Sequence, residues 1–179
     1  MPDPFVVRAA TFDDVPAIAA LIDASVRGLA PGYYTPAQID GGLREVFGVD
    51  TQLIADGTYY VIESDGALAA AGGWSARRTL FGGDQMKGAE DPLLDPAREA
   101  ARIRAFFVHP AWARRGLGRR LYATCAHAAA AAGFTSFALM GTLPGVPLYE
   151  ALGFVKHEDV LVPLADGGVL PGIRMTRDI

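Results

Sequence analysis

The clearest alternation of apolar and polar residues lies between Ala101 and His109 and predicts a buried strand. One side of this strand carries Ile103, Ala105 and Phe107, and the other carries Arg102, Arg104, Phe106 and Val108. Pro110 follows and ends the strand, because proline has no N–H for the sheet ladder. The alternation therefore predicts that both arginines share a face with Phe106 and Val108.

A glycine-containing turn and a helix follow this strand. Arg114-Arg115-Gly116-Leu117-Gly118 leads into a helical pattern that continues to Ala132. The first N–H groups of a helix have no internal partner and carry the positive end of the dipole, so this turn can bind an anion. Arg119 adds a further positive charge. The alternative for this turn alone is an ordinary basic, solvated start of a helix.

Similar patterns predict the other elements of one mixed α/β domain that spans residues 1–179. The predicted strands are 5–9, 58–64, 67–75, 135–140, 154–163 and 169–176, and the other helices are 15–28, 36–47 and 147–152. Gly28 is expected to end the first helix, and Thr35-Pro36-Ala37-Gln38 is typical of a capping box. Asp65-Gly66 predicts a hairpin turn. Residues 76–100 show little regular pattern and predict a long loop, either functional or a surface excursion.

Composition and net charge indicate which kinds of ligand or partner the protein could bind. Hydrophobic residues make up 51% and charged residues 20%, which indicates a globular domain. A net charge of −4 gives no support to nucleic-acid binding, so the local arginines suit a small polyanion. A single cysteine, Cys125, and three histidines predict neither a disulfide nor a metal site. No signal peptide or long apolar run is evident, so we expect a cytoplasmic protein without a membrane segment.

Three motifs in this order resemble one family. Val108-His109-Pro110, Arg114–Gly118 and, after a helix and a strand, Leu148-Tyr149 with Gly153-Phe154 are similar to the GNAT superfamily of acyl-CoA-dependent N-acetyltransferases. The resemblance implies a mixed, mostly antiparallel central sheet of about six to seven strands flanked by about four helices. It also implies acetyl-CoA as cosubstrate, a small-molecule or protein amine as acceptor, and allows a homodimer.

The resemblance also implies roles for individual residues. The coenzyme-binding residues would be Phe106, Phe107, Val108, Arg114, Arg115, Gly116, Leu117, Gly118, Arg119 and Thr142. Ala113 and Thr142 depart from the residues that the family most often has at these positions. Tyr149 matches the family's general acid, because a phenol with a pKa near 10 is protonated at neutral pH.

The base and the acceptor pocket are less defined. Many relatives have a glutamate on the central strand, where this chain has Arg102 and Arg104, which would pair with acids such as Glu99 or recognise an anionic acceptor. The candidates for the general base are Glu63, Asp84, Glu99, His109 and a water molecule. Tyr33, Tyr34, Arg77 and Arg78 are expected to line the acceptor pocket.

The sequence leaves one other function open and gives little support to a second. A catalytically silent acyl-CoA-binding regulatory module is favoured by the absent strand glutamate and opposed by Tyr149. A dinucleotide-binding domain would need a third glycine in a Gly-x-Gly-x-x-Gly run, and that position is Leu121.

Overall fold

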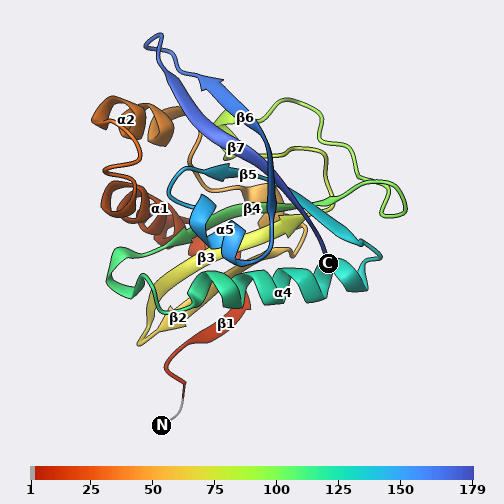
Figure 1. The fold of residues 1–179 in the computed structure, drawn as a ribbon. Helices are drawn as coiled ribbons and strands as arrows, with labels where there is room; N and C mark the ends of the chain where they lie inside the picture. Colours follow the sequence, from red (N-terminus) through yellow and green to blue (C-terminus); the bar gives the residue numbers. More distant parts are fainter. Residues whose placement is uncertain (1–2) are drawn as a thin grey trace.

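A seven-stranded sheet organises the protein, which is described here by a computed structural model over residues 3–179 (Figure 1). Residues 1 and 2 of the predicted 1–179 domain lie outside the described part. The strand order is β1-β2-β3-β4-β5-β7-β6. The strands are β1 (Val6–Ala9), β2 (Tyr59–Ser64), β3 (Ala67–Ser75), β4 (Ala101–Val108), β5 (Ser136–Thr142), β6 (Val155–Pro163) and β7 (Val169–Asp178). The expected mixed, mostly antiparallel sheet is confirmed.

Helices cover both faces of the sheet. On one face, α1 (Val15–Leu29), α2 (Pro36–Glu45) and α3 (Thr51–Ala55) enclose a core that includes Ile18, Tyr59 and Leu170. On the other face, α4 (Leu117–Ala131) and α5 (Val146–Ala151) pack over residues such as Phe137 and Met175. Figure 1 shows α4 running along the sheet, while α1 and α2 lie at the left of the view. The central strands are therefore covered on both faces, whereas β6 at one edge is mostly exposed.

β4 and β5 are the only parallel neighbours in the described sheet, and they separate early. They pair at Ala101↔Phe137 and Arg102↔Ala138, whereas β3 follows β4 as far as Val108. The second half of β4 thus has one edge that is free of strand pairing with β5. This divergence opens the space in which the candidate site lies.

A bulge at Ala105 interrupts the regular alternation of β4. Ala105 has φ of +54°, and the β3–β4 register shifts at this point. The Tyr59 hydroxyl donates a hydrogen bond of 3.2 Å to the Ala105 carbonyl. Ala105 and Phe107 pack with the α1 side of the sheet, whereas Ile103 and Phe106 pack with the α4 side. The prediction that Arg104 shares a face with Phe106 and Val108 is therefore wrong, because the bulge places one extra residue between them.

Most element boundaries agree with the sequence patterns. Thr35 caps α2 and accepts a hydrogen bond from the Gln38 N–H, as the capping box predicts. Gly28 does not end α1, which continues to Leu29; a Cβ on Gly28 would lie 2.3 Å from Pro110 Cγ, so the glycine allows close packing instead. α3 was not predicted, because its five residues are too few for a helical period. Among residues 3–179, no helix combines the length and apolarity needed to cross a bilayer.

The approach of Gly72 to Phe106 gives a testable consequence. A Cβ on Gly72 would lie 2.4 Å from Phe106 Cδ1, so Gly72→Ala forces the ring out of its position. We expect a loss of about 1–3 kcal/mol in the free energy of unfolding, measured by urea denaturation. Gly88→Ala is the control, since no atom lies within 4 Å of its added Cβ. Equal stability of the two variants would contradict the close packing at Gly72.

Candidate active site

Two adjoining cavities occupy the space where β4 and β5 separate. The helix-side cavity, about 160 Å³, extends from the α1 residue Val26 past Val108 to Gly118 at the start of α4. The loop-side cavity, about 60 Å³, is bounded by residues 46–48 and 80–83. Both are lined by Phe47, Phe106, Phe107, Thr142 and Tyr149. Because they share these residues, a ligand in one cavity would meet a ligand in the other beside the same side chains.

Tyr149 lies at the junction of the cavities on the short helix α5. The centroid of its ring lies 6.3 Å from that of the Phe106 ring and 5.7 Å from that of the Phe154 ring. The residue is 8% exposed. Burial raises the pKa of Tyr149 above that of a free phenol. The hydroxyl is therefore protonated at neutral pH and is a proton donor beside both cavities.

The end of α5 explains why glycine and phenylalanine follow Tyr149. Gly153 has φ of +91°, and its N–H bonds the Glu150 carbonyl at 2.9 Å. The Phe154 N–H then bonds the Tyr149 carbonyl at 2.9 Å, which completes a helix-terminating Schellman motif. The reversal brings Phe154 back onto the Tyr149 ring and fixes its orientation.

The turn before α4 has the geometry of an anion site. Arg114 and Gly116 both have left-handed backbone angles, with φ of +64° and +79°. The first helical hydrogen bond runs from the Arg120 N–H to the Gly116 carbonyl, at 3.1 Å. The N–H groups of residues 117–119 precede that bond and have no partner within the helix. Arg114, Arg115 and Arg119 are exposed around this turn.

The edge of β4 supplies backbone groups on the other side of the helix-side cavity. The His109 N–H bonds the Ala69 carbonyl at 2.9 Å and thus points toward β3. Since these directions alternate along a strand, the N–H and C=O of Val108 point away from β3, toward the diverging β5. An extended ligand lying here could add to the sheet as a further strand.

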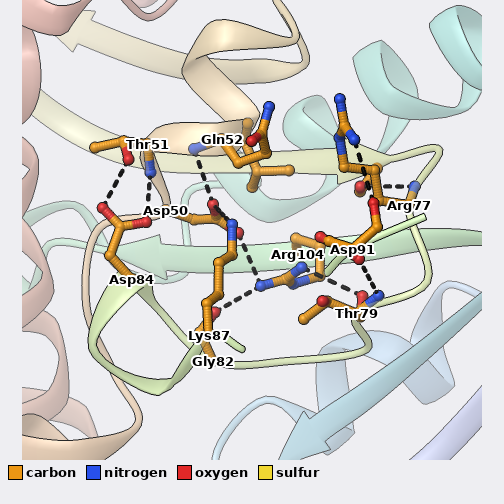
Figure 2. Close-up of polar contacts among 12 residues, drawn as sticks. Asp50, Thr51, Gln52, Arg77, Thr79, Gly82, Asp84, Lys87, Asp91 and Arg104 are labelled. Atoms are coloured by element: carbon orange, nitrogen blue, oxygen red, sulfur yellow. Dashed lines mark hydrogen bonds and ion pairs between the residues drawn. The ribbon is translucent and has the colours of Figure 1, made fainter. Parts of the chain in front are cut away.

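A buried ion pair joins Arg104, which lines the loop-side cavity, to Asp50, which does not (Figure 2). The Arg104 guanidinium is 2.8 Å from Asp50 Oδ2, and the two side chains are 2% and 1% exposed. Burial lowers the pKa of Arg104, and the Asp50 carboxylate offsets part of that shift. Arg104 thus pairs with an acid, as one of the two expected alternatives has it. The partner is Asp50, 54 positions earlier in the chain, and not Glu99.

The predicted acceptor residues separate into two groups. Tyr34 is buried, lines the helix-side cavity, donates to the Pro171 carbonyl at 2.6 Å and accepts from the Leu143 N–H at 3.0 Å. Tyr33 is 50% exposed, Arg77 binds Asp56 at 2.7 Å, and Arg78 lies 3.6 Å from Glu99. These three line neither cavity. Residues 80–83 of the same long loop do line the loop-side cavity.

The four candidate bases have other partners. Glu63, on β2, forms an ion pair of 2.6 Å with Arg8 on β1. Asp84 accepts hydrogen bonds from Thr51. Glu99 accepts from the Asp95 N–H, and His109 Nδ1 accepts from the Ala111 N–H. None of the four lines either cavity of the described chain.

Sequence reasoning did not identify Asp50, Phe47 or Gly145 as parts of the site. Asp50 follows a glycine-containing stretch and caps α3, a local signal that was available. Gly145 allows Tyr149 to approach, since a Cβ there would lie 3.1 Å from Tyr149 Cε2. Phe47 carries no local signal, because its position in the site depends on the packing of α2. No group of three or more potential metal ligands occurs within residues 3–179.

Comparison with known proteins gives one family. The sequence profile of the Acetyltransferase (GNAT) family matches residues 25–154. No curated protein matches the chain significantly.

Solved structures share the fold at low sequence identity. A GCN5-related N-acetyltransferase from Rhodopseudomonas palustris has a TM-score of 0.72 at 17% identity, covering 99% of this chain and 97% of its own. The ribosomal-protein-S18-alanine N-acetyltransferase from Escherichia coli has a TM-score of 0.60 at 17% identity, covering 98% and 94%. The yncA protein from Salmonella typhimurium, solved with acetyl-CoA, has a TM-score of 0.60 at 19% identity, covering 98% and 94%.

Proposed function

The chain belongs to the GNAT family of acetyltransferases, and from this premise we propose that it transfers the acetyl group of acetyl-CoA to a primary amine. The observation that carries the proposal is the position of Tyr149, a buried proton donor at the junction of two cavities. The helix-side cavity would hold the thioester, and the loop-side cavity would hold the amine. The two reactants would then meet beside the Tyr149 hydroxyl.

The residues around the helix-side cavity fit acetyl-CoA. The free N–H groups at the start of α4, with Arg114, Arg115 and Arg119, would bind the pyrophosphate. The pantetheine arm would lie along Phe106, Phe107 and Val108, and Thr142 would offer a hydroxyl on the β5 side. Gly118 allows Leu148 to pack closely against the start of α4 beside this cavity, since a Cβ at Gly118 would lie 2.6 Å from Leu148 Cδ2.

The reaction would proceed by direct attack. The amine nitrogen forms a bond to the acetyl carbon, the carbon–sulfur bond breaks, and the amine loses a proton to water. Only about one part in a thousand of an alkyl amine is neutral at pH 7, so deprotonation contributes to the barrier. Tyr149 donates its proton to the departing sulfur, which leaves as a thiol.

A catalytically silent acyl-CoA-binding module is the second candidate, because no aspartate or glutamate lines either cavity of the described chain. Three amines test the choice. A peptide that begins with alanine follows the S18 relative, cadaverine is an alkyl diamine, and phenethylamine matches the aromatic lining formed by Phe47, Phe81 and Phe106. We expect free-thiol release with at least one amine. Tight acetyl-CoA binding without release would favour the silent module.

Charge at the α4 turn should control the affinity for acetyl-CoA. Gly116→Asp places a carboxylate beside the proposed pyrophosphate, and Gly116→Asn has nearly the same shape and the same left-handed backbone strain. We expect Gly116→Asp to bind acetyl-CoA about 10- to 100-fold more weakly than Gly116→Asn in calorimetry, because only the aspartate repels the phosphates. Equal affinities of the two variants would place the pyrophosphate elsewhere.

Removal of the Tyr149 hydroxyl should slow the chemical step. Tyr149→Phe keeps the ring and its packing, so we expect kcat to fall about 100- to 10,000-fold while the Kd for acetyl-CoA stays nearly constant. Tyr122→Phe is the matched control: Tyr122 is equally buried, at 8% exposed, and packs on the same Phe154 ring but lines neither cavity. Equal kcat values for the two variants would remove Tyr149 from the mechanism.

A further inference from the structure

The loop between β3 and β4 is fixed at both ends of the segment that walls the loop-side cavity. Leu80, Phe81, Gly82 and Gly83 line that cavity. Before them, the Thr79 carbonyl accepts from Arg104 Nη1 at 3.2 Å, and within them the Gly82 carbonyl accepts from Arg104 Nη2 at 2.6 Å. After them, the Asp84 carboxylate accepts from the Thr51 N–H at 3.0 Å and from the Thr51 hydroxyl at 2.8 Å. One guanidinium and one carboxylate thus hold this wall.

The opposite wall of the cavity belongs to the same network. It consists of Val46, Phe47 and Gly48, in the link between α2 and α3. The Val46 carbonyl accepts from the Gly83 N–H at 2.8 Å, and the Val49 carbonyl accepts from the Asp84 N–H at 3.0 Å. These backbone bonds join the two walls directly.

Asp50 is where the contacts of both walls converge. Oδ2 binds Arg104, and Oδ1 accepts from the Gln52 N–H at 3.1 Å and from the Lys87 ammonium (Figure 2). Lys87 is on the far side of the loop, beyond Asp84. Arg104 lies on β4, directly before the bulge at Ala105, and the Arg104 side chain is directed toward Asp50. A strand, a loop and a helix start therefore meet at one carboxylate.

We propose that Arg104 and Asp50 are positioning residues for the amine acceptor, because together they fix the separation of the two walls of the loop-side cavity. The inference rests on the proposed function, in which that cavity takes the amine. The helix-side cavity contains neither residue. The network therefore acts on acceptor binding and leaves the binding of acetyl-CoA nearly unchanged.

The test replaces the guanidinium of Arg104, which has several N–H donors in a fixed plane, by the single ammonium of lysine. Arg104→Lys keeps a positive charge opposite Asp50, but one ammonium cannot reproduce the bonds to Thr79, Gly82 and Asp50 together. Arg98→Lys is the control: it makes the same chemical change in the β3–β4 loop, on a side chain that is 85% exposed. Asp84→Ala is the second variant, since it frees the other end of the wall without leaving a buried charge unpaired.

Three readouts are compared between wild type and these variants. They are KM for the best of the three amines above, KM for acetyl-CoA, and amide hydrogen exchange of the peptide 79–87. In Arg104→Lys and Asp84→Ala we expect the amine KM to rise about 10- to 100-fold, the acetyl-CoA KM to change by less than about twofold, and exchange in 79–87 to accelerate. Arg98→Lys should match wild type in all three.

Failure of the proposed function and failure of the positioning role give different results. Absence of turnover by the wild type with every amine would refute the proposed function. A wild type that turns over an amine, with variants whose amine KM is unchanged or rises in step with the acetyl-CoA KM, would refute the positioning role alone.

Discussion

β4 and β5 pair over two residues and then separate, and the candidate site depends on this separation. Two neighbouring parallel strands would normally close against one another, leaving no room between them. Here the Ala105 bulge, with its left-handed backbone angle, bends β4 at the point of divergence. The buried Tyr59 hydroxyl supports the bulge by bonding the Ala105 carbonyl. The backbone of Val108, the Phe106 ring and the space beside Tyr149 all become available as a result.

The same bulge divides the surroundings of β4 into a side that faces α4 and Tyr149 and a side that faces Asp50. Phe106 packs toward α4 and Tyr149, on the route that leads to the glycine-containing turn. Arg104 packs in the opposite direction, where Asp50 compensates its charge within the protein interior. A charge buried so deeply requires a partner, and that partner ties the 76–100 loop to the α2–α3 link. A segment without regular secondary structure is thereby given a defined position.

Local patterns were sufficient for the elements and for part of the site. Thr35 and Gln38, Asp65-Gly66 and Gly153 specify caps and turns through their own backbone preferences, so their positions followed from a few adjacent residues. The bulge was not predictable in this way, because alanine carries no preference for a left-handed conformation and the supporting Tyr59 is 46 residues away. The partner of Arg104 is 54 residues away, and no periodicity reports such a contact. Sequence reasoning therefore singled out the turn and Tyr149, which lines both cavities, but not residues 46–48 and 80–83 of the loop-side cavity.

We propose that the diverging edge of β4 binds the acyl-CoA arm, and a crystal structure of the protein with CoA tests this binding most directly. We expect density for the pantetheine arm between Phe106–Val108 and Thr142–Tyr149, the sulfur beside the Tyr149 hydroxyl, and the pyrophosphate on residues 114–119. Density for CoA at any other place, with the gap between β4 and β5 empty, would contradict it.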